Sequence, residues 1–206
     1  MKALIFTGGD FLPPDNFNYE KYDLVICADK GLENIKKVGL KPDAALGDFD
    51  SVTSDIDIPI IKYPAEKDVT DTEIAIDYCV EKGADDIMIL GGTGGRLDHT
   101  LANILLLKRK MDKGVKIKMY DGTNLCFVTD KNVEIEKNDK KYISLFALGE
   151  SVCGLTLRGV KYSLNKHCLE SDSSLGVSNE IVSDRAEIEF ESGVLLIILS
   201  RDRMVK

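Results

Sequence analysis

Positive charge, cysteine pairs of the C-x-x-C type and long apolar segments are all missing or scarce in this sequence. Its 27 Lys and Arg residues are outnumbered by 35 Asp and Glu residues, which gives a formal net charge of −8. Nucleic-acid-binding proteins cluster basic residues against the phosphate backbone, so this balance argues against a nucleic-acid partner. A cationic or metal-chelated ligand fits an acidic chain better.

The cysteines are odd in number, and no two have metal-site or redox-motif spacing. They are Cys27, Cys79, Cys126, Cys153 and Cys168. This pattern predicts neither a disulfide framework nor a zinc site, so we expect five buried thiols in a reducing cytoplasm. The longest apolar runs, such as Val194–Leu199, are far shorter than the ~20 residues of a membrane-spanning helix. We therefore expect a cytoplasmic protein without an export signal or membrane anchor.

The first part of the chain, residues 1–125, alternates short apolar runs with helical patterns. The predicted strands are Ala3–Phe6, Leu24–Ala28, Ala44–Leu46, Ile58–Ile61 and Ile87–Leu90. Helices are predicted up to Lys37, over 70–82 with Gly83 as the stop, and over 100–111. Strands separated by helices indicate an α/β domain with a Rossmann-like, mostly parallel sheet.

The second part, residues 130–206, loses the helical pattern after a turn at 121–124. The predicted strands are Val133–Glu136, Tyr142–Phe146, Leu155–Leu157, Ala186–Phe190 and Val194–Leu199. The Glu191-Ser192-Gly193 segment between the last two indicates a hairpin. We expect a small all-β sandwich.

One acidic stretch, residues 46–72, concentrates the candidate chemistry. Two aspartate pairs, Asp48/Asp50 and Asp68/Asp71, flank the apolar run Ile58–Ile61, which we expect to be a buried strand. If that strand runs parallel to Ala44–Leu46, both pairs leave the sheet at the edge where open α/β sheets bind ligands. Carboxylates gathered there repel one another unless a hard cation such as Mg²⁺ binds between them. The stretch therefore predicts a Mg²⁺–nucleotide site.

A glycine-rich loop, residues 91–95, joins the strand Ile87–Leu90 to the next helix and is followed by Arg96, Asp98 and His99. A strand, a glycine loop and a helix N-terminus form a natural anion site, with Arg96 as the fixed cation. The loop matches neither the P-loop pattern nor G-x-G-x-x-G. The turn Thr7-Gly8-Gly9-Asp10 could also bring backbone N–H groups close to phosphate, although a glycine pair is a weak signal.

Several of these residues also have purely structural explanations. Thr70 and Glu73 have the spacing of a capping box, and acids such as Asp71 favour a first helical turn. Asp98 could be a helix N-cap, and His99 a surface histidine.

Five segments taken together resemble the thiamin pyrophosphokinase family, in the same order and over nearly the whole chain. They are GDFDS (47–51), KDVTDTEIA (67–75), GGTGGRLDHTLAN (91–103), RGVKYSL (158–164) and GVSNE (176–180). The resemblance implies an α/β nucleotide domain followed by a β-sandwich that holds thiamin. It also implies Mg²⁺-dependent transfer of pyrophosphate from ATP to thiamin, leaving AMP, in a homodimer whose sites lie between subunits.

The same resemblance implies residue roles. Catalysis would involve Asp48, Asp50, Asp71 and Arg96, with Asp71 orienting or deprotonating the thiamin hydroxyl. Mg²⁺ would be held by Asp48, Asp50, Asp71 and Asp68. ATP would contact Asp29, Asp48, Ser51, Arg96, Asp98 and His99. Thiamin would contact Thr70, Asp71, Tyr162 and Ser178. Tyr162 departs from the tryptophan of animal members but keeps an aromatic face for the thiazolium cation.

Two alternatives remain open. A pyrophosphokinase acting on another heterocyclic alcohol, of the hydroxymethylpterin type, would use the same ATP motifs, although GVSNE and Tyr162 favour thiamin. A non-catalytic nucleotide or thiamin sensor would hold its ligand without turnover. The complete set of acidic motif residues argues against a sensor, which has no need of an in-line Mg²⁺ clamp.

Overall fold

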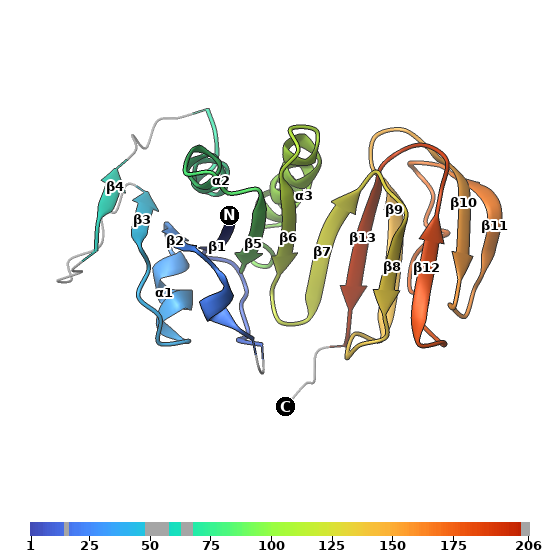
Figure 1. Cartoon of the computed structure of the whole chain (residues 1–206), viewed down its shortest axis with the longest axis horizontal. Coiled ribbons are helices and arrows are strands. Elements are labelled where there is room, and N and C mark those ends of the chain that lie inside the picture. Colours follow the sequence, from blue (N-terminus) through green and yellow to red (C-terminus); the bar gives the residue numbers. More distant parts are fainter. Residues whose placement is uncertain (15–16, 48–57, 63–67, 203–206) are drawn as a thin grey trace. The chain divides into compact units, whose positions relative to one another are not determined.

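The computed structural model describes residues 1–14, 17–47, 58–62 and 68–202, and it divides the chain into two compact units. Unit 1 is Met1–Gly122 and unit 2 is Thr123–Lys206. The predicted fold class, an α/β sheet with helices followed by an all-β sandwich, is confirmed (Figure 1).

The sheet of unit 1 is parallel throughout its described strands. They are β1 (Lys2–Phe6), β2 (Leu24–Ala28), β3 (Ala44–Gly47), β4 (Ile60–Lys62), β5 (Asp86–Leu90) and β6 (Lys116–Tyr120). They lie in the order β4-β3-β2-β1-β5-β6, and β1 pairs on one side with β2 and on the other with β5. Every strand therefore ends at the same edge of the sheet, so the loops that follow the strands gather there.

Helices lie in four of the connections between these strands, as expected for parallel pairing. They are α1 (Gly31–Lys36), α2 (Asp71–Glu81), α3 (Leu97–Met111) and the short 3₁₀ helix η1 (Tyr19–Lys21). The predicted stop of α2 is confirmed at Gly83, whose φ of 93° is a left-handed conformation that glycine adopts without strain. In the described part of the chain, no helix is long and apolar enough to span a membrane.

Both faces of the central strands in unit 1 are buried. Leu4 and Phe6 pack in one cluster with Leu32 and Ile35 of α1, and the alternating residue Ile5 is fully buried as well. Strands covered on both sides are expected to be apolar runs without alternation, which is the pattern that the sequence shows.

Three cysteines, Cys27, Cys79 and Cys126, are buried and form no disulfide, as predicted. Burial raises the pKa of Cys27 and of Cys79 to about 12, so both stay protonated and unreactive.

The parallel pairing predicted for the strands that flank Asp48 and Asp50 is confirmed, because Ala45 of β3 lies opposite Ile60 of β4. The prediction that this second strand is buried is wrong. Ile60 is exposed and Ile61 only half-buried, since among the described strands β4 lies at the edge of the unit 1 sheet, next to β3 alone. An apolar run of this length cannot by itself distinguish a central strand from an edge strand.

Unit 2 consists of antiparallel strands in two groups. Strands β7 (Asn124–Thr129), β13 (Leu195–Ser200) and β9 (Tyr142–Ala147) pair in that order. The second sheet has the order β11 (Leu164–Leu169), β10 (Val152–Arg158), β12 (Arg185–Glu189) and β8 (Val133–Glu136).

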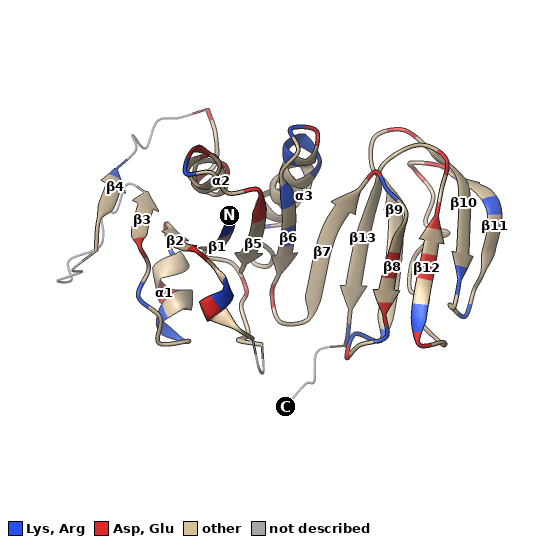
Figure 2. Cartoon of the chain, viewed as in Figure 1, with Lys and Arg blue, Asp and Glu red and all other residues tan. Residues whose placement is uncertain are grey.

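Alternate residues of both groups form one core. Ile143 and Leu145 of β9 share it with Leu155 and Leu157 of β10 and with Ile188 of β12. Such alternation is what places every second side chain between two packed sheets. The intervening residues of β12 are charged, so its ribbon carries blue and red segments in Figure 2. On that outer side, Arg185 pairs with Glu134 of β8 at 3.0 Å.

The predicted hairpin at Glu191-Ser192-Gly193 is wrong. The strand before it, β12, pairs with β10 and β8, whereas the strand after it, β13, pairs with β7 and β9. The segment therefore crosses from one sheet to the other. Gly193 has a φ of 103°, and a Cβ there would lie 2.8 Å from the Ser151 carbonyl oxygen, so glycine serves a tight crossing and not a hairpin turn.

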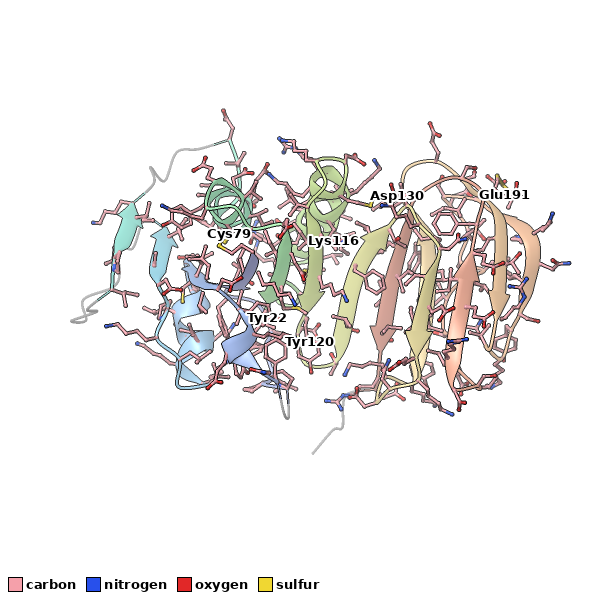
Figure 3. The ribbon with its side chains drawn as sticks, viewed as in Figure 1. Tyr22, Cys79, Lys116, Tyr120, Asp130 and Glu191 are labelled. Carbon is pink, nitrogen blue, oxygen red and sulfur yellow. A yellow bond between two sulfur atoms is a disulfide. The ribbon has the colours of Figure 1, made fainter. Side chains whose placement is uncertain are left out.

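Two of the five cysteines also depart from the prediction of free thiols, because Cys153 and Cys168 form a disulfide. The two cysteines lie on the paired strands β10 and β11. The N–H of Glu191, which is labelled in Figure 3, donates to the Cys153 carbonyl. Spacing along the chain could not reveal this pair, since strand register brings the two residues together.

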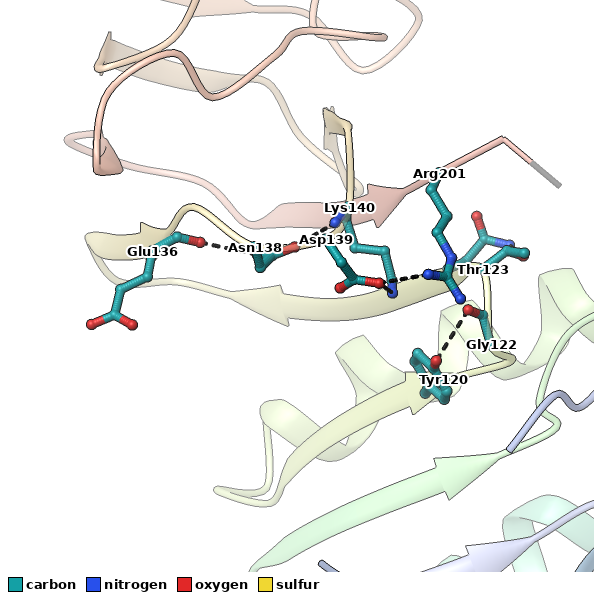
Figure 4. A network of polar contacts seen from close by, with 9 residues as sticks. Tyr120, Gly122, Thr123, Glu136, Asn138, Asp139, Lys140 and Arg201 are labelled. Carbon is teal, nitrogen blue, oxygen red and sulfur yellow. Dashed lines mark hydrogen bonds and ion pairs between the residues drawn. The ribbon is translucent and has the colours of Figure 1, made fainter. Parts of the chain in front are cut away.

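The last residues described in unit 2 are held by charge. The Asp139 carboxylate accepts hydrogen bonds from Lys140 Nζ and from Arg201 Nη1, both at 2.8 Å (Figure 4). Both contacts lower the pKa of Asp139, and the hydrogen bond from Lys140 has the larger effect. The network fixes the end of β13 against the turn between β8 and β9.

Candidate nucleotide and substrate site

The strand order of unit 1 reverses between β1 and β5, which makes this the switch point of the sheet. The loops that follow these two strands lie side by side there. Gly9 N–H donates to the Gly91 carbonyl at 2.9 Å, and Asp10 N–H donates to the Thr93 carbonyl at 2.7 Å. In open α/β sheets, a switch point is where ligands bind.

The two glycine segments at the switch point have different roles. The turn after β1 uses the N–H groups of Thr7, Gly9 and Asp10 in bonds to β5 and its loop, so the prediction that this turn brings N–H groups to phosphate is wrong for these three. The turn instead supports the glycine loop, residues 91–95. A Cβ at Gly94 would lie 2.3 Å from Asp10 Cγ, so only glycine allows this approach.

Helix α3 begins directly after the glycine loop, with Arg96 at its N-cap position and no side-chain cap. The alternative explanation of Asp98 as the N-cap is therefore wrong. Asp98 instead accepts hydrogen bonds from Arg96 Nε at 3.1 Å and from the His99 N–H at 3.0 Å. Arg96 and Asp98 are 73% and 61% exposed, so this face of the helix N-terminus is open to an anion.

The Arg96–Asp98 pair also sets the charge at this helix end. Its hydrogen bond lowers the pKa of the Asp98 carboxyl and raises that of Arg96. Both groups stay charged near neutral pH, so an incoming phosphate would compete with Asp98 for the guanidinium.

Asp29 follows β2 and has a φ of 46°, which is uncommon for a residue other than glycine. Its N–H donates to the Leu46 carbonyl at 2.8 Å, so its backbone lies beside the end of β3, where the Asp48 segment begins. A strained aspartate at a ligand-binding sheet edge is a common feature of functional sites.

The other aspartate pair lies at the start of α2. Thr70 is the N-cap, and its hydroxyl oxygen accepts the Glu73 N–H at 3.2 Å, which confirms the capping half of the structural explanation. Asp71 is the first helical residue and half-buried, and Asp68 is exposed just before it.

Glu73 does not complete the capping box as its spacing suggested. Its carboxylate accepts a hydrogen bond from Arg109 Nη1 of α3 at 2.6 Å, and buried Lys110 bonds Asp77 of α2 at 2.5 Å. These contacts hold α2 against α3, the two helices at whose N-termini Asp71 and Arg96 lie.

Asp48, Asp50 and Ser51 lie outside the described residues. Within the described ranges, no three His, Cys, Asp or Glu side chains are close enough to hold a metal ion. The described acids at this edge include Asp29, Asp68 and Asp71, together with Asp10 and Asp98 at the switch point. Their oxygen donors are of the type that Mg²⁺ prefers.

In unit 2, a buried asparagine organises the predicted thiamin residues. Asn179, 7% exposed, accepts the Tyr162 N–H at 3.0 Å and donates to the Tyr162 carbonyl at 2.8 Å. Ser178 beside it has a φ of 59° and donates its N–H to Ser144 Oγ at 3.0 Å. Tyr162 is 62% exposed, with Lys161 Nζ 5.5 Å from its ring centre.

Sequence reasoning missed Asn179 as a positioning residue, although it lies within GVSNE. It also missed Asn34 of α1, which bonds the turn after β1. The available signal was a polar residue between the apolar positions Leu32 and Ile35 of a short helix, which is too common to single out one asparagine.

Comparison with known proteins places both units. Residues 18–119 match the family described as thiamin pyrophosphokinase, catalytic domain, and residues 131–195 match thiamin pyrophosphokinase, vitamin B1 binding domain. The thiamine pyrophosphokinase of Bacillus subtilis (strain 168) is 38% identical over 209 residues, which cover 97% of this chain and 98% of the relative.

Two solved structures also match this chain over nearly its whole length. A crystal structure of thiamine pyrophosphokinase from Bacillus subtilis matches with a TM-score of 0.88 at 35% identity, covering 98% of this chain and 100% of the other. A thiamin pyrophosphokinase family protein from Enterococcus faecalis matches with a TM-score of 0.87 at 30% identity and the same coverage.

The fold, a doubly wound α/β unit followed by an antiparallel sandwich, is shared with these relatives, and the family matches place the chain among the diphosphate-transferring kinases. The two family matches span both units, and the Bacillus relative extends over nearly the whole chain. The chain belongs to the thiamin pyrophosphokinase family.

Proposed function

We propose that the protein transfers the β,γ-diphosphoryl group of ATP to the hydroxyl oxygen of thiamin, forming thiamin pyrophosphate and AMP. The observation that carries this proposal is the exposed Arg96 at the uncapped N-terminus of α3, directly after the glycine loop at the switch point. A guanidinium, a helix N-terminus and a close-packed glycine loop together suit a polyphosphate.

The reaction requires positioning and neutralisation of charge more than covalent catalysis. Arg96 would give up its bond to Asp98 to hold the transferred phosphates, while Asp98, His99, Asp29 and Ser51 contact the nucleotide. Asp71, at the first turn of α2, would orient the thiamin hydroxyl and accept its proton.

We also propose that Asp48, Asp50, Asp71 and Asp68 hold Mg²⁺. The cation would neutralise phosphate charge and orient the transferred group. The fit rests on the donor chemistry at this sheet edge, where Asp29, Asp68 and Asp71 bring carboxylate oxygens to strand and helix ends. Those carboxylates would also favour the cationic thiazolium ring.

Tyr162 and Ser178 are proposed to bind thiamin together with Thr70 and Asp71. The ring of Tyr162 is exposed and Lys161 Nζ lies 5.5 Å from its centre, a geometry that supports a cation-binding role for this ring. A thiazolium ring would take a similar place.

The decisive experiment incubates the purified protein with Mg²⁺, ATP and thiamin, and separates AMP from ADP. We expect AMP and thiamin pyrophosphate in equal amounts. A parallel incubation with a hydroxymethylpterin tests the alternative substrate. AMP release with the pterin alone, or ligand binding without any turnover, would replace the proposal with one of the two alternatives.

We further propose a cytoplasmic homodimer whose sites combine residues of both subunits, as the family resemblance implies. The test mixes an Asp71→Asn protein with a Tyr162→Ala/Ser178→Ala protein, each expected to be inactive alone. Sites shared between subunits give a mixed dimer one intact site, so activity should partly return. No recovery, with subunit exchange demonstrated by mass spectrometry, would assign each site to a single chain.

A further inference from the structure

Two buried polar side chains that the proposed reaction does not use lie beneath the switch point. Thr7 directly follows β1 and is 5% exposed, and Asn34 lies in α1 and is 3% exposed. Buried polar groups are retained where their hydrogen bonds are satisfied, so their partners indicate what they hold in place.

The Asn34 amide connects α1 to the turn after β1. Its Nδ2 donates to the Thr7 carbonyl at 2.6 Å and to the Gly9 carbonyl at 3.0 Å. Its Oδ1 accepts from Lys37 Nζ at 2.7 Å, which fixes the orientation of the amide. A flipped amide would place Oδ1 against two carbonyl oxygens, an arrangement without a donor.

Thr7 continues this chain of contacts to the glycine loop. Its Oγ1 lies 2.5 Å from the Gly91 carbonyl and 3.2 Å from the Leu90 carbonyl, both of which are acceptors. The packing leaves no space for adjustment, because a Cβ on Gly91 would lie 2.8 Å from the Thr7 carbonyl oxygen and 2.9 Å from Asn34 Nδ2. Gly91 is therefore fixed from two elements at once.

We propose that Thr7 and Asn34 are positioning residues for the nucleotide: they hold Gly91 so that the glycine loop places Arg96 and the N-terminus of α3 against the phosphates. The inference rests on the proposed function of that loop. Neither residue touches the substrate. Displacement of reacting groups by about 1 Å is enough to lower turnover by about 10²-fold, so a buried hydroxyl can affect phosphate transfer from a distance.

The test compares Thr7→Val, which removes the hydroxyl and keeps the shape, with Thr7→Ser, which keeps the hydroxyl. For Thr7→Val we expect kcat to fall and the KM for Mg·ATP to rise, each by about threefold, so that kcat/KM falls by about tenfold, the equivalent of one buried hydrogen bond. The KM for thiamin should not change. Binding of Mg²⁺ with the non-hydrolysable α,β-methylene-ATP, measured by calorimetry, should weaken to the same extent. Thr7→Ser should recover most of both.

A merely structural role would lower the melting temperature of Thr7→Val while its kcat and its KM for Mg·ATP stay at wild-type values below that temperature. That result would overturn the proposal. Failure of the wild-type protein to release AMP would instead overturn the proposed function.

If Thr7→Val does not fold, the proposal can be tested at Lys37, an exposed residue. Lys37→Met removes the hydrogen bond that orients the Asn34 amide, and it should raise the KM for Mg·ATP by about threefold, the lower range for one hydrogen bond. Lys36→Met, an adjacent exposed lysine of α1, is the matched control and should behave as wild type. Equal behaviour of Lys37→Met and Lys36→Met would contradict the role of Asn34.

Discussion

The two units gather their candidate substrate residues in different ways. In unit 1, Asp29, Asp71 and Arg96 follow different strands, and parallel topology alone brings all three to one edge. In unit 2, Tyr162 and Ser178 come from loops between antiparallel strands, and the buried side chain of Asn179 connects them. In unit 1, each candidate residue is therefore held by a different strand or helix. In unit 2, the position of both candidate residues depends on one side chain.

This difference predicts where single substitutions act. In unit 1, a substitution at Asp29, Asp71 or Arg96 should remove the function of that residue and leave the other two in place. In unit 2, a substitution away from the substrate should disturb thiamin binding as a whole. The four experiments below test this contrast, starting with the largest expected effect.

The largest effect is expected from Asp48→Asn or Asp50→Asn. Loss of a carboxylate that neutralises phosphate charge through Mg²⁺ removes several kcal/mol of transition-state stabilisation, so kcat should fall by about 10³-fold without loss of the fold. The measurement is AMP release at saturating Mg²⁺, with circular dichroism to confirm folding. Asp55→Asn, in the same stretch but outside GDFDS, is the control. Near-normal AMP release in the GDFDS variants would remove both residues from the metal site.

Arg96→Lys should have the next largest effect. A lysine keeps the charge but cannot form the two parallel hydrogen bonds of a guanidinium, so we expect kcat to fall by about 10²-fold. Arg201→Lys, which changes the Asp139 ion pair of unit 2, should leave kcat at the wild-type value. An unchanged rate for Arg96→Lys would make Arg96 an ordinary surface residue.

Asn179→Ala tests the dependence of unit 2 on one side chain. It leaves the Tyr162 N–H and carbonyl without their partner, at a cost of about 1–3 kcal/mol, so the KM for thiamin should rise by about tenfold. The KM for ATP should not change. Asn132→Ala is the matched control, because Asn132 Oδ1 accepts the Phe190 N–H at 3.0 Å in the same unit but away from Tyr162. An equal rise in both KM values for Asn179→Ala would show general damage to the protein.

The smallest effect concerns the Arg96–Asp98 pair. Because the guanidinium holds the pKa of Asp98 below 3.8, its contribution to stability is present above that value and is lost as pH falls through the lower folded pKa. Both groups are exposed, so the loss should be barely measurable in unfolding experiments. NMR titration should detect it directly, with the pKa of Asp98 returning toward 3.8 in Arg96→Met. The same pKa in both proteins would mean that the ion pair does not persist in solution.

The sequence predicted unit 1 better than unit 2 for a physical reason. A parallel βα unit has local signals: an apolar run, a glycine or acidic turn, and then an amphipathic helix. The register follows once the strands are aligned, so the edge position of Asp29 and Arg96 could be predicted. The exposure of Ile60 could not, because an edge strand and a central strand have the same local pattern.

In unit 2, strand partners are set by contacts between residues far apart in the chain. The turn at Gly193 looks like a hairpin locally, and only the partners of β12 and β13 show that it crosses between sheets. Strands β7 and β11 were missed for a related reason. β11 has no continuous apolar run that would mark a buried strand. β7 does have one, over 125–128, but it directly follows the turn at 121–124 and its residues are mostly half-buried. Buried asparagines such as Asn34 and Asn179 are likewise recognised only through their partners.

The position of β13 between β7 and β9 has a consequence for how the protein is made. During synthesis, residues 124–147 leave the ribosome well before Leu195, so β7 and β9 must wait for the strand that pairs with both. The sheet of unit 1, from β1 to β6, contains only residues that are made earlier. Loop closure over such a separation slows folding, and it leaves strand edges exposed in the meantime. Newly made chains would therefore complete unit 2 last, and its unpaired strand edges would stay exposed for longer than those of unit 1.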